Sequence, residues 1–186
     1  MVSSVYETLN KAWNSTCRVL FGQEVGDLSD CSEWLREYEE RLRVEKSSVS
    51  GKPVTFSVDD YASGAKYLDF GEVDFGRKFQ PLSVNEIKDI DSIVRAVQER
   101  IYYTGNVVLG NSSQVQTSSS VLESHFVLDS TVVSDSKYVA YSRYVKGGEY
   151  CFGIFGSTKV EYIVKCMGSE LKRCFDALSE DPEVRG

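Results

Sequence analysis

The sequence predicts an α+β protein built around a short β-solenoid, with an amino-terminal helical segment and a carboxy-terminal capping helix. A six-residue repeat begins at Ser112 and has serine first and valine fourth in successive blocks, and similarity at a fixed period marks a repeat architecture. The flanking segments carry apolar residues at helical spacing. We therefore divide the 186 residues into a helical segment with short strands packed on the repeat (1–105), the hexad-repeat solenoid (106–166), and a capping helix and tail (167–186).

The repeat consists of the blocks SSQVQT, SSSVLE, SHFVLD, STVVSD, SKYVAY, SRYVKG and GEYCFG. A helix would spread the valine column around its surface, because a period of six fits neither 3.6 nor 3.5 residues per turn. In a solenoid each block supplies one short strand and a corner. With three blocks per coil, the seven blocks would make about two and a third coils, and the period is expected to break over 154–160. An antiparallel β-meander with helices on one face is the alternative.

Two apolar columns run through the repeat and are expected on opposite faces of its strands. Serine and the third position lie two residues apart and are expected on one strand face, and the adjacent valine is expected to face the other way unless a corner intervenes. Both columns must be hidden, one in the core and the other under the amino-terminal helices or another chain. The bulky third positions complete the core or, if the valines fill it, form the candidate interaction surface: Phe126, Tyr138, Tyr144 and Tyr150.

Helical periodicity and turn residues predict the flanking elements. Helices are expected over 4–21, 31–43 and 168–178, with a strand over 54–58 and a short helical turn over 62–67. In the helix over 31–43, the run of charged residues is interpreted as a solvated face.

The element predicted most strongly is a helix over 83–104. Ser83 and Glu86 form an S-x-x-E capping box, and Gly105 is placed to end the helix. The apolar positions fall on one side, which predicts a helix that faces the core: Val84, Ile87, Ile90, Val94, Val97 and Ile101.

Two Asp-Phe-Gly triplets, 69–71 and 74–76, match the metal-binding element of protein kinases. The glycine-rich loop, strand lysine and catalytic-loop signatures of those enzymes are missing from this sequence. We therefore interpret both triplets as turns whose phenylalanines anchor a loop to the core.

Composition excludes several function classes. The formal net charge of −7, from 28 acidic and 21 basic residues, argues against nucleic acid or an anionic membrane surface as the main partner. No apolar run approaches the roughly 18 residues of a membrane span, and no secretion signal precedes the first predicted helix. Five cysteines without C-x-x-C spacing favour free thiols in an intracellular, reducing compartment.

The repeat offers few residues for chemistry, and we predict no catalytic, cofactor-binding or metal-ligating residue. Ser124 and His125 are adjacent on a strand and point to opposite faces, so they are poorly placed to pair as nucleophile and base. The acidic positions Glu123, Asp129 and Asp135 suggest calcium as an alternative, but an acidic residue before a serine more simply satisfies local backbone donors. Cys151 stands in the valine column and is expected to be a small buried side chain.

The N-S-S-x-V start and the E/D-S-x-x-V-x-D-S blocks, over 106–166, resemble repeat tracts in uncharacterised proteins of large DNA viruses and uncultured archaea. The small-then-bulky spacing is also distantly similar to hexapeptide-repeat β-helix acyltransferases, although valine follows the bulky residue here and the catalytic histidine context of those enzymes is missing. We expect a non-catalytic structural or assembly component that acts through protein partners or self-association. The viral resemblance implies a minor capsid or scaffold protein associated with the virion. The alternatives are a hexapeptide-type acyltransferase and a carbohydrate or small-ligand binding module that uses the tyrosine column.

Overall fold

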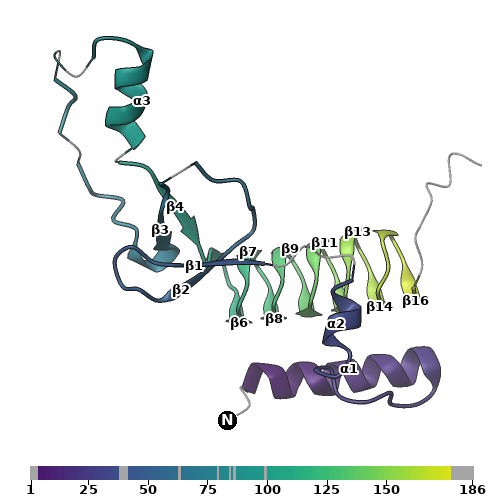
Figure 1. The fold of residues 1–186 in the computed structure, drawn as a ribbon. Helices are drawn as coiled ribbons and strands as arrows, with labels where there is room; N and C mark the ends of the chain where they lie inside the picture. The colour runs from purple at the N-terminus through teal and green to yellow at the C-terminus, as the bar shows by residue number, and fades with distance from the viewer. Residues whose placement is uncertain are drawn as a thin grey trace, which may run out of the picture.

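The computed structural model describes residues 4–37, 42–62, 64–78, 80–83, 85, 87–98 and 100–176. A β-solenoid forms the body of the molecule, two helices lie along one side of it, and a small α/β unit sits at its first coil (Figure 1). The predicted solenoid is therefore confirmed, and strands are parallel within its walls, which excludes the meander.

Two parallel six-stranded sheets form the solenoid walls, and consecutive strands of the chain alternate between them. The β5 sheet contains β5 (Val108–Leu109), β7 (Ser119–Leu122), β9 (Thr131–Ser134), β11 (Arg143–Lys146), β13 (Phe155–Thr158) and β15 (Gly168–Ser169). The β6 sheet contains β6 (Ser113–Gln116), β8 (His125–Leu128), β10 (Lys137–Ala140), β12 (Glu149–Phe152), β14 (Glu161–Val164) and β16 (Lys172–Phe175).

Each coil takes two hexad blocks, not three. Lys137 pairs with His125 in one neighbouring strand and with Glu149 in the other, so equivalent positions stack twelve residues apart. With six strands in each sheet, the chain makes about six turns where we expected two and a third. A coil is complete after two blocks because each block forms one wall and one corner.

The backbone bends twice in every block, because the third and sixth positions adopt positive φ. Phe126 and Tyr138 have φ of 56° and 57°, and the sixth-position residues Asp129 and Asp135 have φ of 44° and 51°. A left-handed residue within a strand interrupts the usual alternation of side chains between faces. First-position serines and fourth-position valines are consequently both buried, while the bulky third residue stays partly exposed. The expectation that serine shares a face with the bulky third residue is wrong for this reason, whereas valine does face away from that residue.

The repeat continues beyond the seventh block. Phe155 pairs with Arg143 and Glu161 with Glu149, so the twelve-residue spacing holds over 154–160, where we expected a break. One residue is lost only later, since Glu161 pairs with Lys172, eleven residues on.

The carboxy-terminal capping helix is not found. β15 and β16 occupy most of the stretch predicted as a helix over 168–178, and residues from 177 onward lie outside the described part. Leu171 and Cys174, which lie in this stretch, pack against the interior core of the solenoid. Their spacing of three residues suits a helix, but it also places them at the first and fourth positions of a block.

Two ladders of serines run along the solenoid interior, one at each corner. The hydroxyl of Ser130 accepts a hydrogen bond from the backbone N–H of Ser142 in the next coil (3.0 Å) and donates to the carbonyl of Leu128 (2.8 Å). Ser118, Ser124, Ser136 and Ser142 repeat this arrangement at their own coils. Each hydroxyl therefore supplies the acceptor that a corner N–H would otherwise lack.

Apolar side chains fill the rest of the interior. Val121, Val127, Val133 and Val139 are almost fully buried, and Cys151 continues their column with no exposed surface, as predicted. Valine from one sheet faces valine from the other, so the two walls share one narrow core.

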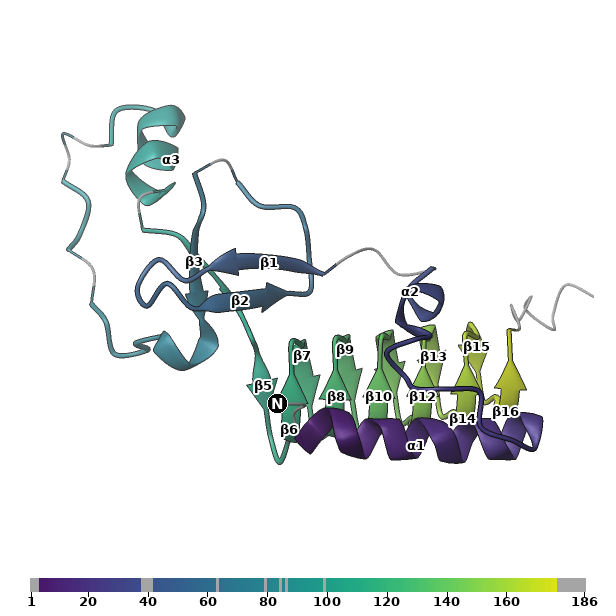
Figure 2. The same ribbon diagram turned by 60° about the horizontal axis from the view of Figure 1, so that its bottom comes forward.

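Helix α1 (Ser4–Phe21) covers the outer face of the β6 sheet (Figure 2). Its buried Leu9 and Trp13 belong to a core cluster with the fifth-position residues Leu128, Ala140, Phe152 and Val164. The rings of Trp13 and Phe152 meet edge to face, with centroids 5.3 Å apart. The amino-terminal segment thus covers the apolar outer face of the β6 sheet, one of the two possibilities derived from the sequence, whereas Tyr144 on the other sheet stays exposed.

Helix α2 (Ser32–Leu35) is much shorter than the helix expected over 31–43. Residues 38–41 lie outside the described part, and a strand begins at Arg43. Leu35 rests on the solenoid corner at Gly153, where an added Cβ would lie 2.7 Å from the Leu35 carbonyl oxygen. Gly153 is therefore required for the helix to approach this closely.

The small α/β unit joins two strand pairs. β1 (Arg43–Lys46) is antiparallel to β2 (Pro53–Phe56), which confirms the predicted strand at 54–58 with a small shift. β3 (Lys66–Asp69) is parallel to β4 (Tyr102–Gly105), with the 3-10 helix η1 (Phe70–Glu72) after β3 and helix α3 (Ile90–Gln98) between the two strands. The short helical turn predicted over 62–67 is wrong, because its last residues begin β3.

Helix α3 corrects two expectations about the helix over 83–104. It is nine residues long, and its first turn is capped by Asp89, whose carboxylate accepts from the N–H of Ser92 (2.7 Å). Glu86, the partner in the predicted capping box, lies outside the described residues. None of the residues of α3 is buried, so the helix does not face the core. The carboxy-terminal part of the predicted helix forms β4 instead, in register with β3.

Both Asp-Phe-Gly triplets form turns, as predicted. The carboxylates of Asp69 and Asp74 accept from the N–H groups of Gly71 (2.8 Å) and Gly76 (2.9 Å). Phe75 is 80% exposed, however, so it does not anchor the loop to the core.

The serine ladder gives a direct test of this architecture. Replacement of Ser130 by alanine removes the acceptor of a buried Ser142 N–H, and we expect it to lower the free energy of unfolding by about 1–3 kcal/mol. Urea denaturation of the full chain measures this change. The matched control is Ser134→Ala, on the half-exposed outer face of the same wall, where we expect less than about 0.5 kcal/mol. Equal stability of the two variants would contradict a structural role for the ladder.

Candidate interaction surfaces

The four aromatic residues predicted as an interaction surface lie on opposite walls. Phe126, Tyr138 and Tyr150 stand on β8, β10 and β12 of the β6 sheet, whereas Tyr144 stands on β11 of the β5 sheet. Consecutive blocks alternate between the two walls because each coil takes two blocks. The structure therefore brings together three of these residues and separates the fourth. The separation of Tyr144 was not predicted, because three blocks per coil were expected.

The aromatic residues of the β6 sheet form a stack with Tyr162. Ring centroids are 5.3 Å apart for Phe126 and Tyr138, 4.9 Å for Tyr138 and Tyr150, and 4.6 Å for Tyr150 and Tyr162. Burial within this stack raises the pKa of Tyr150. Rings in the middle of the stack have both faces covered by their neighbours. A sugar that packs on an open aromatic face finds none there, and the stack chiefly supports helix α1, against which it packs.

A groove of about 270 Å³ runs beside this stack. It is lined by residues of α1 and by two tyrosines: Thr8, Lys11, Ala12, Ser15, Tyr138 and Tyr150. Lys11 is the single charged group among them, so the groove lacks a set of converging polar groups that would fix a small ligand.

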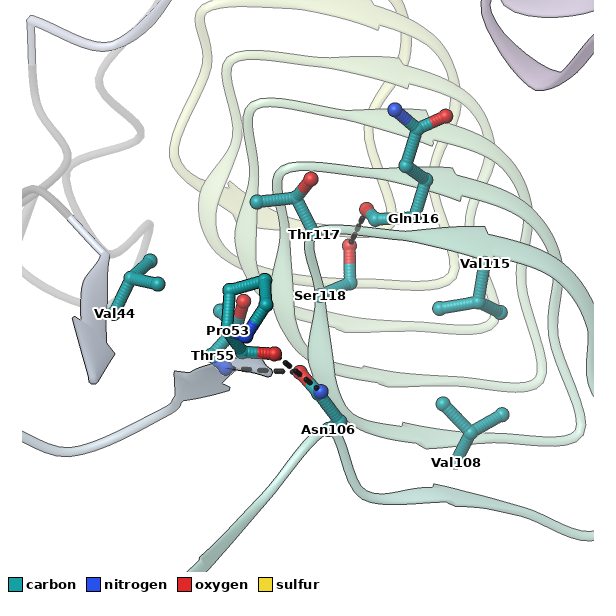
Figure 3. Close-up of a pocket in the computed structure, with 9 residues that line it drawn as sticks. All are labelled: Val44, Pro53, Thr55, Asn106, Val108, Val115, Gln116, Thr117 and Ser118. Carbon is teal, nitrogen blue, oxygen red and sulfur yellow. Dashed lines mark hydrogen bonds between the residues drawn. The ribbon is translucent and has the colours of Figure 1, made fainter. Parts of the chain in front are cut away.

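A larger cleft of about 390 Å³ lies between the α/β unit and the first coil (Figure 3). Asn106, which has a φ of 51°, joins the two parts: its side chain accepts from the Thr55 N–H (2.8 Å) and donates to the Pro53 carbonyl (3.2 Å) and to Asp69 (2.6 Å). The lining consists of uncharged residues: Val44, Pro53, Thr55, Asn106, Val108, Val115, Gln116, Thr117 and Ser118. The cleft thus holds no acid, base or thiol that would serve as a catalytic group.

His125 and the acidic positions are separated by the fold. The imidazole Nδ1 of His125 lies 2.9 Å from the hydroxyl of Ser113, while Ser124 is buried in the serine ladder. The prediction that Ser124 and His125 do not pair is therefore confirmed. Asp129 lies at one corner of the solenoid, and Glu123 and Asp135 lie at the other, because successive blocks alternate. Across the described part of the chain, no three His, Cys, Asp or Glu side chains gather to hold a metal ion.

Charged residues of the α2 segment bind the solenoid corner. Arg36 pairs with Asp129 and lies 4.3 Å over the ring of Tyr141. Burial raises the pKa of Asp129, and the guanidinium of Arg36 opposes that rise. Glu37, the residue after Arg36, pairs with the buried Lys165. Arg36 is thus a docking residue, and the interpretation of this charge run as a solvated face is wrong for it. Glu37 stays exposed while it pairs with Lys165.

All five cysteines are free thiols. Burial lowers the reactivity of Cys17 and Cys151. Burial raises the pKa of Cys17 to about 11, and it raises the pKa of Cys151 further. Because the thiolate is the reactive species, a raised pKa lowers reactivity at neutral pH. Cys17 belongs to the core under α1, and Cys151 belongs to the solenoid interior.

We expect native-state alkylation to report this burial. At pH 8, a rise in the pKa of Cys17 from 9.0 to about 11 lowers its thiolate fraction roughly a hundredfold. Iodoacetamide followed by peptide mass spectrometry should therefore modify Cys17 far more slowly in the folded chain than in urea. The half-buried Cys31 is the internal comparison. Rapid native labelling of Cys17 would contradict the placement of α1 on the β6 sheet.

Helix α3 presents an apolar face that the described residues leave uncovered. Ile90 is 78% exposed and Val94 is 55% exposed, and Ile93 and Val97 are exposed on the same side. Together with the exposed Ile87 before the helix and Ile101 after it, these residues are called the arm face: Ile87, Ile90, Ile93, Val94, Val97 and Ile101. Figures 1 and 2 both show α3 standing apart from the other helices and strands, beyond the first coil. The apolar stripe of this helix was visible in the sequence, but the stripe alone does not say whether its partner is the same chain.

Comparison with family models, curated protein sequences and solved structures finds no match to this chain. Within the described residues, none of the helices combines the length and the apolar character needed to cross a membrane.

Proposed function

We propose that this protein is a non-catalytic structural or assembly component that acts through protein–protein contacts, with the arm face as its docking surface. The observation that carries the proposal is helix α3, which is amphipathic and yet has no buried residue. Burial of apolar surface stabilises an interface by roughly 25 cal/mol per Å², and contiguous exposed apolar patches on monomers commonly mark interaction sites.

The length of α3 supports the same proposal. Isolated helices shorter than about 12 residues are marginal in water, and helices in proteins gain most of their stability from packing of the apolar face. Helix α3 has nine residues and lacks such packing within the described chain. A partner that covers the arm face would therefore stabilise the helix and bury the row at the same time.

The solenoid supplies a rigid base for this surface. The valine column fills its interior and α1 covers the apolar outer face of the β6 sheet, so these two surfaces are occupied while the arm face is open to another molecule. The resemblance to repeat proteins of large DNA viruses favours a minor capsid or scaffold role within this proposal. The uncharged lining of the 390 Å³ cleft and the mutually covered tyrosine rings favour docking over an acyltransferase or a carbohydrate-binding module.

Replacement of Val94 by glutamate tests the proposal. Val94 is exposed, so we expect a change of less than about 0.5 kcal/mol in folding stability, whereas a buried carboxylate at an interface would be strongly unfavourable. The tagged full chain is purified from its source cells after chemical crosslinking, and its partners are quantified by mass spectrometry. We expect the major crosslinked partner to be lost from Val94→Glu.

The matched control is Val49→Glu, which makes the same change at a 72% exposed valine in the β1–β2 turn. This variant should keep the crosslinked partner. An unchanged set of partners in Val94→Glu would contradict the proposed function.

A further inference from the structure

We infer that the arm face binds a second copy of the same chain, through an antiparallel pairing of the two α3 helices. This inference rests on the proposed function, and it names the occupant of the docking surface. The arrangement of charges along the two edges of the arm face is the observation that selects this occupant.

Each edge of the arm face carries an acidic residue near its amino-terminal end and a basic residue near its carboxy-terminal end. Asp91 and Arg95 are four residues apart, so at 3.6 residues per turn they lie along one edge. Asp89 caps the amino-terminal end of α3, and Arg100 lies in the turn after its last residue. They are eleven residues apart, close to three turns, so a helical projection places both toward the opposite edge. Asp91 and Arg95 are exposed, and Arg100 also donates to the Gln80 carbonyl (2.6 Å).

A parallel pair of these helices would be repelled by its own edges. In a parallel pair, opposite edges of the two helices meet at the same height. Asp91 would then lie near Asp89 of the partner subunit, and Arg95 would lie toward Arg100 of the partner subunit. Like charges at such positions are destabilising.

An antiparallel pair brings together the same edge of each helix in reversed direction. Asp91 then faces Arg95 of the partner subunit. By twofold symmetry, Arg95 faces Asp91 of the partner subunit. Asp89 and Arg100 make the equivalent match on the other edge. Both matches place the centre of the pair near residues 93–95, at the middle of the apolar row. The surface is thus complementary to itself, which is the property that a twofold interface requires.

The size of the pair sets its expected strength. Nine residues span about 14 Å, so the contact is well below the roughly 800 Å² per partner of a standard interface. We therefore expect a weak, reversible dimer whose population rises with protein concentration. Both views place α3 beyond the end of the solenoid, so the two solenoids would extend away from the shared helices (Figures 1 and 2).

Sedimentation equilibrium of the full chain tests the pairing with two charge reversals. Asp91→Arg gives this edge two positive side chains, and Arg95→Asp gives it two negative ones. We expect each variant alone to dimerise about tenfold or more weakly than the native chain. An equimolar mixture of the two should recover dimerisation, because each mixed pair is again complementary. The native dimer and the difference between variants should both respond to salt, since exposed charges are screened.

The matched control is Asp60→Arg, which reverses an exposed aspartate outside the arm face and should dimerise as the native chain does. A native chain that stays monomeric at high concentration, or a mixture that does not recover, would overturn the inference. Stronger dimerisation of Asp91→Arg would indicate a parallel pair and would equally overturn it. If the native chain is monomeric and Val94→Glu still loses its crosslinked partner, this inference fails while the proposed function stands.

Discussion

The left-handed backbone at every third residue of the repeat is the constraint on which the rest of the structure depends. It turns the chain at each corner and also interrupts the alternation within each strand. Serine and valine can therefore share the interior although three positions separate them. Non-glycine residues occupy most of these positions at a cost of roughly 1–2 kcal/mol each. Stacked side chains, serine hydrogen bonds and interstrand bonds of successive coils offset that cost together.

The outer faces of the two solenoid walls differ in polarity, so only one of them needs to be covered by another part of the chain. Fifth-position residues of the β6 sheet are apolar and are covered by α1. The equivalent positions of the β5 sheet are mostly polar and lie open or half-open, at Leu122, Ser134, Lys146 and Thr158. One helix is consequently enough to complete the solenoid. The α/β unit contacts the first coil through Asn106, and it carries the arm face, an apolar surface without a partner among the described residues.

The repeat made the solenoid predictable, because six serines and valines in register have no helical explanation. The number of blocks per coil was not predictable in the same way, since it depends on positive φ at residues such as Val132 and Tyr138, which seldom adopt that conformation. For the same reason, the sequence did not show that Tyr144 lies on the other wall from Phe126, Tyr138 and Tyr150. The spacing of Leu171 and Cys174 fits a helix and a hexad block equally well. This stretch forms a strand because it pairs with β14 and packs against the interior core of the solenoid.

The arm face shows a different limit of sequence reasoning. The periodicity over 83–104 correctly indicated an amphipathic helix, but amphipathicity records only that a face needs a partner. Whether that partner belongs to the same chain depends on where the fold places the helix. Here α3 stands apart from the solenoid (Figure 1), and Ile90 and Val94 are exposed.

Amide hydrogen exchange of the full chain at low and high concentration tests the central claim most directly, because it reports on α3 without any substitution. The account predicts strong protection of the solenoid strands and α1 at both concentrations, and weak protection of α3 that rises only when its face is covered. Protection of α3 in the dilute chain equal to that of the strands would contradict the claim, since it would mean that the helix is already packed against its own chain.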